Sequence, residues 1–159
     1  MKIAIACDHA GFDLKQELCA LIKSLGHEVS DLGAYKEEPS DDYPDFAEKV
    51  GDALVAKRAE RGVLICGSGV GVSVASNKIP GVRAAMCHDC YSAHQGVEHD
   101  DMNVLVLGSR IIGSALAADL VRTYLSAKFN ANEERFVRRL NKVKAIEQRH
   151  MPEAAQQGK

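Results

Sequence analysis

The chain has 159 residues, 46% hydrophobic and 26% charged, with 5% aromatic residues and no tryptophan, which predicts one globular domain with an aliphatic core. Twenty basic and 22 acidic residues give a net charge of −2, which argues against nucleic-acid binding through a strongly basic surface. No stretch reaches the roughly 18 apolar residues of a membrane helix, the start is a poor signal peptide and the five cysteines favour reduced thiols, so we expect a cytoplasmic protein without a membrane partner.

Short apolar runs alternate along the chain with segments of helical spacing. In chain order they predict a strand over residues 2–7, a helix over 12–25, a strand over 27–32, a loop over 34–42, a helix over 43–61, a strand over 62–66, a glycine turn with a helix to residue 77, a strand over 82–87, a helix over 91–99, a strand over 103–107, and helices over 111–127 and 132–149.

This alternation of five short strands with helices indicates the fold class. It predicts a single α/β domain over residues 1–150, a Rossmann-like three-layer sandwich in which helices cover both faces of a five-stranded parallel sheet. The polar residues 151–159 are expected to form a flexible tail.

Ligands of such sheets bind outside the carboxyl ends of the strands, so the residues that follow each strand are candidates for a site. They are Asp8-His9, Gly67-Ser68-Gly69, His88-Asp89 and Ser109-Arg110. The turn CGSGVG at 66–71 is the strongest local signal, because glycines let backbone N–H groups approach a phosphate or an oxyanion. It lacks the lysine of a nucleotide P-loop, and a plain strand-to-helix turn explains it equally well.

Three cysteine and histidine patterns leave alternatives open. A thiol at a helix start, such as Cys66, can have a lowered pKa and act as a nucleophile or base, or it can be a buried apolar residue. The pair Cys87-X-X-Cys90 fits a redox or zinc motif, but the other cysteines are isolated, which favours coincidence. Asp8-His9 and His99-Asp100-Asp101 fit a metal site, a proton donor or hydrogen bonding in a surface loop.

The last predicted helix combines an apolar stripe with arginines. We expect the stripe to be buried; it consists of Phe136, Leu140, Val143 and Ile146. Arg135 and Arg139 are neighbours one turn apart on its flank, and an anion between them would relieve their repulsion. A solvated basic face is the alternative.

Six segments resemble the ribose/galactose isomerase family, and in particular type B ribose-5-phosphate isomerases. They are IAIACDHAGFDLK at 3–15, DYPDFA at 42–47, LICGSGVGVSVASNKIPGVRAA at 64–85, HDCYSA at 88–93, NVLVLGSR at 103–110 and ERFVRRLNKVKAIE at 134–147. Together they cover nearly the whole chain outside the tail, so the resemblance is specific.

The resemblance implies an enzyme that interconverts ribose 5-phosphate and ribulose 5-phosphate through an enediolate, in the pentose phosphate pathway. It implies no metal or other cofactor, and a homodimer or homotetramer whose active sites are shared between subunits. Cys66 would be the base, as in the family branch that has a cysteine here and lacks a glutamate at the position of Val72. Ser68 would assist at the reacting hydroxyl, and His99 would open the sugar ring.

The resemblance also implies the binding residues. The backbone amides of the loop would hold the enediolate oxygen; this loop contains Gly67, Gly69, Val70 and Gly71. Asp8, His9 and Tyr43 would bind the sugar. The phosphate would lie on Arg110, Arg135 and Arg139, with help from His9.

One residue departs from the family pattern. Asp100 stands where the family usually has a substrate-contacting asparagine, and an ionised carboxylate cannot donate a hydrogen bond. Another substrate therefore stays open, such as a four-carbon sugar phosphate, galactose 6-phosphate or allose 6-phosphate. A non-catalytic sugar-phosphate-binding protein and a metal hydrolase that uses Asp8, His9, His99, Asp100 and Asp101 are further alternatives.

Overall fold

The structure, a computed structural model, describes residues 1–151 as strands and helices in regular alternation. In chain order the elements are β1 (Lys2–Cys7), the 3-10 helix η1 (His9–Gly11), α1 (Phe12–Ser24), β2 (Glu28–Asp31), α2 (Tyr43–Val55), β3 (Arg61–Cys66), α3 (Val70–Ser76), β4 (Ala84–Met86), α4 (Cys90–Asp100), β5 (Val104–Gly108), α5 (Ser114–Ser126) and α6 (Glu134–His150). Of the predicted tail, residues 152–159 lie outside the described residues.

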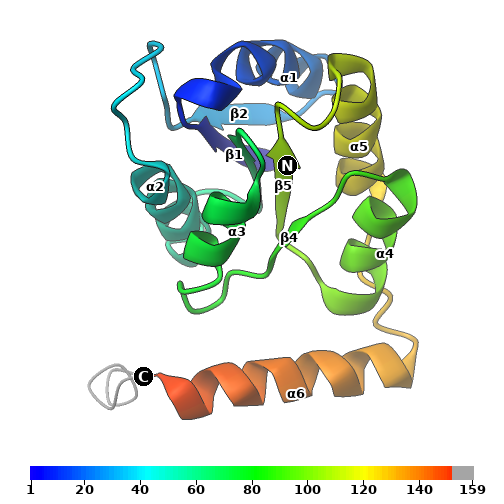
Figure 1. The fold of residues 1–159 in the computed structure, drawn as a ribbon. Coiled ribbons are helices and arrows are strands. Elements are labelled where there is room, and N and C mark those ends of the chain that lie inside the picture. Colours follow the sequence, from blue (N-terminus) through cyan, green and yellow to red (C-terminus); the bar gives the residue numbers. More distant parts are fainter. Residues whose placement is uncertain (152–159) are drawn as a thin grey trace.

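The sheet is five-stranded and parallel throughout, with the order β2-β1-β3-β5-β4. Helix α5 contacts both α1 and α4 on one face of the sheet, and α2 packs against α3 on the other (Figure 1). The connections through α1 and α4 cross the sheet in one direction, and those through α2 and α3 cross it in the other. Because parallel crossovers are right-handed, the two pairs of helices lie on opposite faces. The predicted fold, an α/β sandwich of three layers, is confirmed.

The three inner strands form the core. Because helices cover both faces, β1, β3 and β5 are buried along nearly their whole length and read as continuous apolar runs. The edge strands β2 and β4 are only partly buried. None of the helices within residues 1–151 is long and apolar enough to cross a bilayer.

The Lys15 side chain ties α1 to the end of β2 and to the loop that follows it. Lys15 Nζ lies 2.6 Å from Asp31 Oδ1 and donates a hydrogen bond to the carbonyl oxygen of Ala34 at 2.7 Å. The Lys15 side chain is fully buried. Since an unpaired buried charge is costly, this contact fixes the start of the loop that leads to α2.

Two sequence-based expectations about helices were wrong. The helix predicted over 43–61 ends at Val55, because Lys57 adopts φ +54° and the chain turns directly into β3. In α6, Phe136 and Leu140 are buried, but Val143 and Ile146 are half exposed. Helix α6 contacts the domain mainly through α4, so the second half of its apolar stripe does not reach the core (Figure 1).

Candidate active site

The first part of the site forms where β1 and β3 end side by side. Cys7 pairs with Ile65, so the next residues, Asp8 and Cys66, emerge together at the carboxyl edge of the sheet. The Cys66 thiol donates a hydrogen bond to Asp8 Oδ2, with Sγ and Oδ2 2.9 Å apart. Asp8 also begins η1, where its Oδ1 accepts from the backbone N–H of Ala10 at 3.0 Å. The carboxylate is thus held in place by one backbone bond and presented to the thiol.

Burial and the Asp8 carboxylate raise the pKa of the Cys66 thiol above its ordinary value. The backbone N–H groups of Gly69 and Gly67 oppose this shift in part. The lowered pKa considered from the sequence is therefore wrong in direction, because the loss of hydration and the adjacent carboxylate outweigh the amides. At neutral pH the thiol carries its proton and donates it to Asp8.

The glycine loop lies directly against this pair. Gly69 adopts φ +84°, a conformation that side chains disfavour, and α3 begins at the next residue. A Cβ atom on Gly71 would lie 2.8 Å from Cζ of Tyr43, so only glycine lets the tyrosine ring approach the loop this closely. Ser68 is exposed, and its Oγ accepts from the N–H of Val70 at 3.3 Å.

Residues after β5 and before α2 complete this end of the site. The backbone N–H of Arg110 donates to the Gly67 carbonyl oxygen at 3.0 Å, which places the arginine beside the loop. His9 Nδ1 lies 2.7 Å from Asp41 Oδ1. The sequence did not single out Asp41, because it sits in a polar run, EEPSDD, that reads as solvated loop.

We call this group the cysteine cluster. It contains Asp8, His9, Asp41, Tyr43, Cys66, Ser68, Arg110 and the loop 67–71.

A second group, the histidine cluster, lies at the end of α4 and the start of α6. It contains Gln95, His99, Asp100, Arg135, Phe136 and Arg139. The His99 and Phe136 rings stack with centroids 4.0 Å apart, and Arg135 Cζ lies 5.1 Å from the Phe136 centroid. Arg139 follows Arg135 by one turn of the same helix, as the spacing predicted.

Gln95, which the sequence did not mark, organises the histidine cluster. Its Nε2 lies 2.9 Å from His99 Nδ1 and donates to Asp100 Oδ2 at 3.3 Å. An amide nitrogen can only donate, so Nδ1 of His99 accepts and the ring proton sits on Nε2. Gln95 thus leaves the Nε2 of His99, which lies 3.8 Å from Glu98 Oε2, as the nitrogen that carries the proton, and it gives the Asp100 carboxylate a partner.

The two clusters lie at opposite ends of the sheet in one chain. Cys66 pairs with Gly108 at the carboxyl end of β5, whereas His99 precedes the amino end of the same strand at Val104. At about 3.3 Å per residue, the length of β5 alone separates these ends by roughly 13 Å. Figure 1 shows α6 at the bottom of the view, with the arrow of β5 pointing away from it. A single copy therefore does not unite Cys66 with His99.

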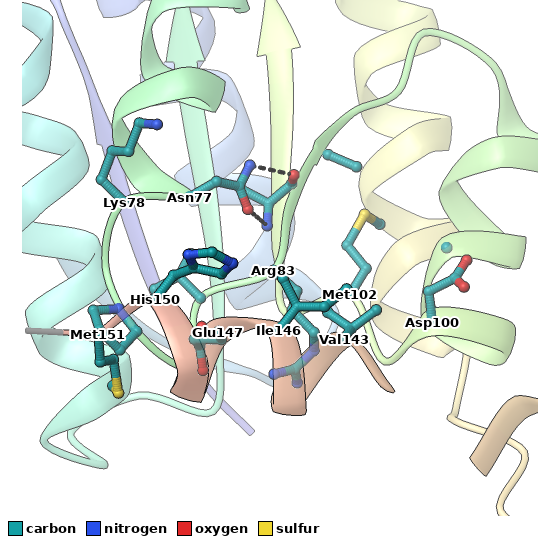
Figure 2. Close-up of a pocket in the computed structure, with 15 residues that line it drawn as sticks. Asn77, Lys78, Arg83, Asp100, Met102, Val143, Ile146, Glu147, His150 and Met151 are labelled. Atoms are coloured by element: carbon teal, nitrogen blue, oxygen red, sulfur yellow. Dashed lines mark hydrogen bonds between the residues drawn. The ribbon is translucent and has the colours of Figure 1, made fainter. Parts of the chain in front are cut away.

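A groove of about 710 Å³ runs between α6 and the edge of the sheet near β4 (Figure 2). Apolar side chains form much of its wall, among them Met102, Val143 and Ile146. Of the predicted site residues only Asp100 lines it, and neither Cys66 nor His99 does. Because the groove lacks Cys66, Asp8 and His99, we take the two clusters, and not this groove, as the candidate active site.

The Cys87-X-X-Cys90 pattern forms no redox or metal site in this structure. Both thiols are free, Cys90 is exposed, and burial raises the pKa of Cys87 to about 11, which keeps that thiol protonated and unreactive at neutral pH. Within residues 1–151, no three His, Cys, Asp or Glu side chains are grouped so as to hold a metal ion.

Comparison with known proteins shows which family the chain belongs to. Residues 3–143 match the sequence profile of the ribose/galactose isomerase family. The chain belongs to the ribose/galactose isomerase family. It is 43% identical over 148 residues to ribose-5-phosphate isomerase B of Escherichia coli, an alignment that covers 93% of this chain and 97% of that protein.

Other members of the family show the range of its substrates and the persistence of its fold. The structure of ribose-5-phosphate isomerase B from Clostridium thermocellum superposes with a TM-score of 0.90 at 44% identity, over 95% of this chain and all of that one. The LacB subunit of galactose-6-phosphate isomerase from Clostridium acetobutylicum is 36% identical over 84% of this chain and 77% of its own length. Membership of the family makes this chain an aldose–ketose isomerase, and the resemblance seen in the sequence is confirmed.

Proposed function

We propose that this isomerase interconverts ribose 5-phosphate and ribulose 5-phosphate through an enediolate, without a metal ion, in the cytoplasm. The observation that carries the proposal is the Cys66 thiol bonded to Asp8 beside the glycine loop. Moving a proton between two adjacent carbons needs one base and one site for the developing oxyanion, and the sulfur and the loop amides supply them within one small volume.

In this reaction the Cys66 thiol first passes its proton to Asp8 Oδ2. The thiolate then removes the proton from C2 of the aldose, the C–H electron pair forms the C1–C2 double bond, and the carbonyl electrons move onto O1. The N–H groups of the loop 67–71 stabilise that charge, and Ser68 assists the transfer of the hydroxyl proton from O2 to O1. Delivery of the C2 proton from the Cys66 thiol to C1 gives the ketose, and Asp8 then returns its proton to the thiolate.

Ring opening and phosphate binding use the other predicted residues. The Nε2–H of His99 acts as the acid–base group on the ring oxygen. Arg110 and His9 hold the phosphate together with Arg135 and Arg139, whose guanidinium groups suit phosphate oxygens. Since the two clusters are far apart in one chain, we infer that the protein is a homodimer or a homotetramer made of two such dimers. Each site then combines the cysteine cluster of one subunit with the histidine cluster of its partner.

The direct test is conversion of ribose 5-phosphate to ribulose 5-phosphate by the purified protein in excess EDTA. We expect saturable turnover that added divalent metal does not increase. A parallel panel of aldose phosphates with four and six carbons, including allose 6-phosphate and galactose 6-phosphate, ranks the substrates by kcat/KM. Turnover abolished by EDTA would mean that the isomerisation requires a metal ion, and turnover confined to another aldose phosphate would mean that ribose 5-phosphate is not the substrate.

The Asp100 carboxylate gives a second prediction about the substrate. Asp100→Asn is expected to raise kcat/KM for ribose 5-phosphate by about two- to tenfold, because the amide adds a donor and removes a charge that repels the anionic substrate. Steady-state kinetics measure this, with Asp52→Asn on the exposed face of α2 as the matched control. A fall in kcat/KM would mean that the carboxylate serves the substrate, and would favour another sugar phosphate.

A further inference from the structure

The cysteine cluster contains a carboxylate to which the proposed reaction gives no task. Asp41, in the loop before α2, accepts two hydrogen bonds from His9 on its Oδ1: one from ring Nδ1 at 2.7 Å and one from the backbone N–H at 3.2 Å. Its side chain is only 11% exposed. The other oxygen, Oδ2, is buried and has no hydrogen-bond partner within residues 1–151. The Asp41 carboxylate is therefore directed at His9.

This arrangement fixes the direction of the imidazole and favours its charged form. With Nδ1–H donated to Asp41, the nitrogen left for a ligand is Nε2, and the His9 side chain remains 30% exposed. The hydrogen bond to Asp41 raises the pKa of His9, partial burial opposes the shift, and the charges of Asp41 and Asp8 add to it while Arg110 opposes it. These three groups, from the loop before α2, from the end of β1 and from the segment after β5, are the charged groups that act on His9.

We propose that Asp41 is a positioning residue that holds His9 as an imidazolium with its Nε2–H presented to the substrate phosphate. The inference rests on the proposed role of His9 in phosphate binding. An imidazolium donates a charge-assisted hydrogen bond, which is stronger than a neutral one. Asp41 thereby keeps phosphate binding strong at pH values where an ordinary histidine is neutral.

The test removes the charge of Asp41 and keeps its shape. Asp41→Asn can still accept from Nδ1, but it no longer stabilises the cation. We expect His9, followed by NMR of labelled imidazole in the ligand-free protein, to titrate at lower pH than in the wild type. We expect KM for ribose 5-phosphate to rise about three- to tenfold at about pH 8 and to change little at about pH 6, with kcat nearly constant.

Glu37→Gln, which removes an exposed charge from the same loop, is the matched control and should leave both readouts unchanged. An unchanged His9 titration in Asp41→Asn overturns the proposal, as does a shifted titration with equal KM at both pH values. Binding of inorganic phosphate, read from the His9 signal, needs no turnover. If Asp41→Asn weakens phosphate binding at about pH 8, the positioning role is supported even where the wild type isomerises no ribose 5-phosphate. Failure of the positioning role is thus distinguished from failure of the proposed isomerase function.

Discussion

Replacing Cys66 with alanine is expected to lower kcat for isomerisation by about 10²–10⁴-fold, the usual contribution of a general base. The Cys66 sulfur is the atom proposed to move the proton between C1 and C2. In the resting enzyme its thiol donates a hydrogen bond to Asp8. The phosphate and sugar contacts come from other side chains, so the Kd for ribose 5-phosphate should stay near the wild-type value. Steady-state assays give kcat and titration calorimetry gives Kd, so the loss of turnover is measured separately from substrate binding.

Cys90→Ala is the matched control, because that thiol is exposed and lies outside both clusters. A Cys66→Ala enzyme with wild-type kcat would contradict the assignment of the base. The wild-type pH profile provides a second readout. Because burial and Asp8 raise the pKa of Cys66, the thiolate fraction grows as pH rises, and kcat/KM should climb from neutral into alkaline pH. Cys66→Ala should lose this climb along with its activity.

Part of this site could be read from the sequence because the residues follow buried strands. Strands β1 and β3 are covered on both faces, so their apolar runs are continuous and their ends are visible in the sequence. In a parallel sheet those ends lie at one edge, which brings Asp8 to Cys66. Other properties of the site depend on tertiary contacts that the local sequence does not contain. The pKa of Cys66 depends on its burial, which the local sequence at a helix start does not report.

Asp41 and Gln95 show what the sequence pattern could not reveal. Each acts through hydrogen bonds to a histidine; Asp41 sits in a polar loop, and Gln95 is one of several polar residues of helix α4. The end of α2 was missed for a related reason. Lys57 turns the chain with φ +54° in a stretch, AKRAE at 56–60, that has no glycine or proline to mark the turn. Such positions become visible only when the partner groups are placed in space.

Co-expression of two inactive variants is expected to restore activity. Cys66→Ala damages the cysteine cluster and His99→Asn damages the histidine cluster, so each homodimer has two defective sites. In a heterodimer with one copy of each, one shared site carries both lesions and the other carries neither. With different affinity tags on the two variants, the purified heterodimer should show about half the wild-type activity per dimer, since two-fold symmetry gives two equivalent sites.

This outcome follows from the separation of the clusters and not from the chemistry assigned to either residue. If each site belonged to one chain, every site in the heterodimer would carry one lesion, and its activity would stay at the level of the single variants. The matched control is a heterodimer of Cys66→Ala with Ser68→Ala, two changes in the same cluster. Both of its shared sites are defective, so it should remain inactive. Recovery in the first pair and none in the second would place His99 and Cys66 of the same working site on different subunits.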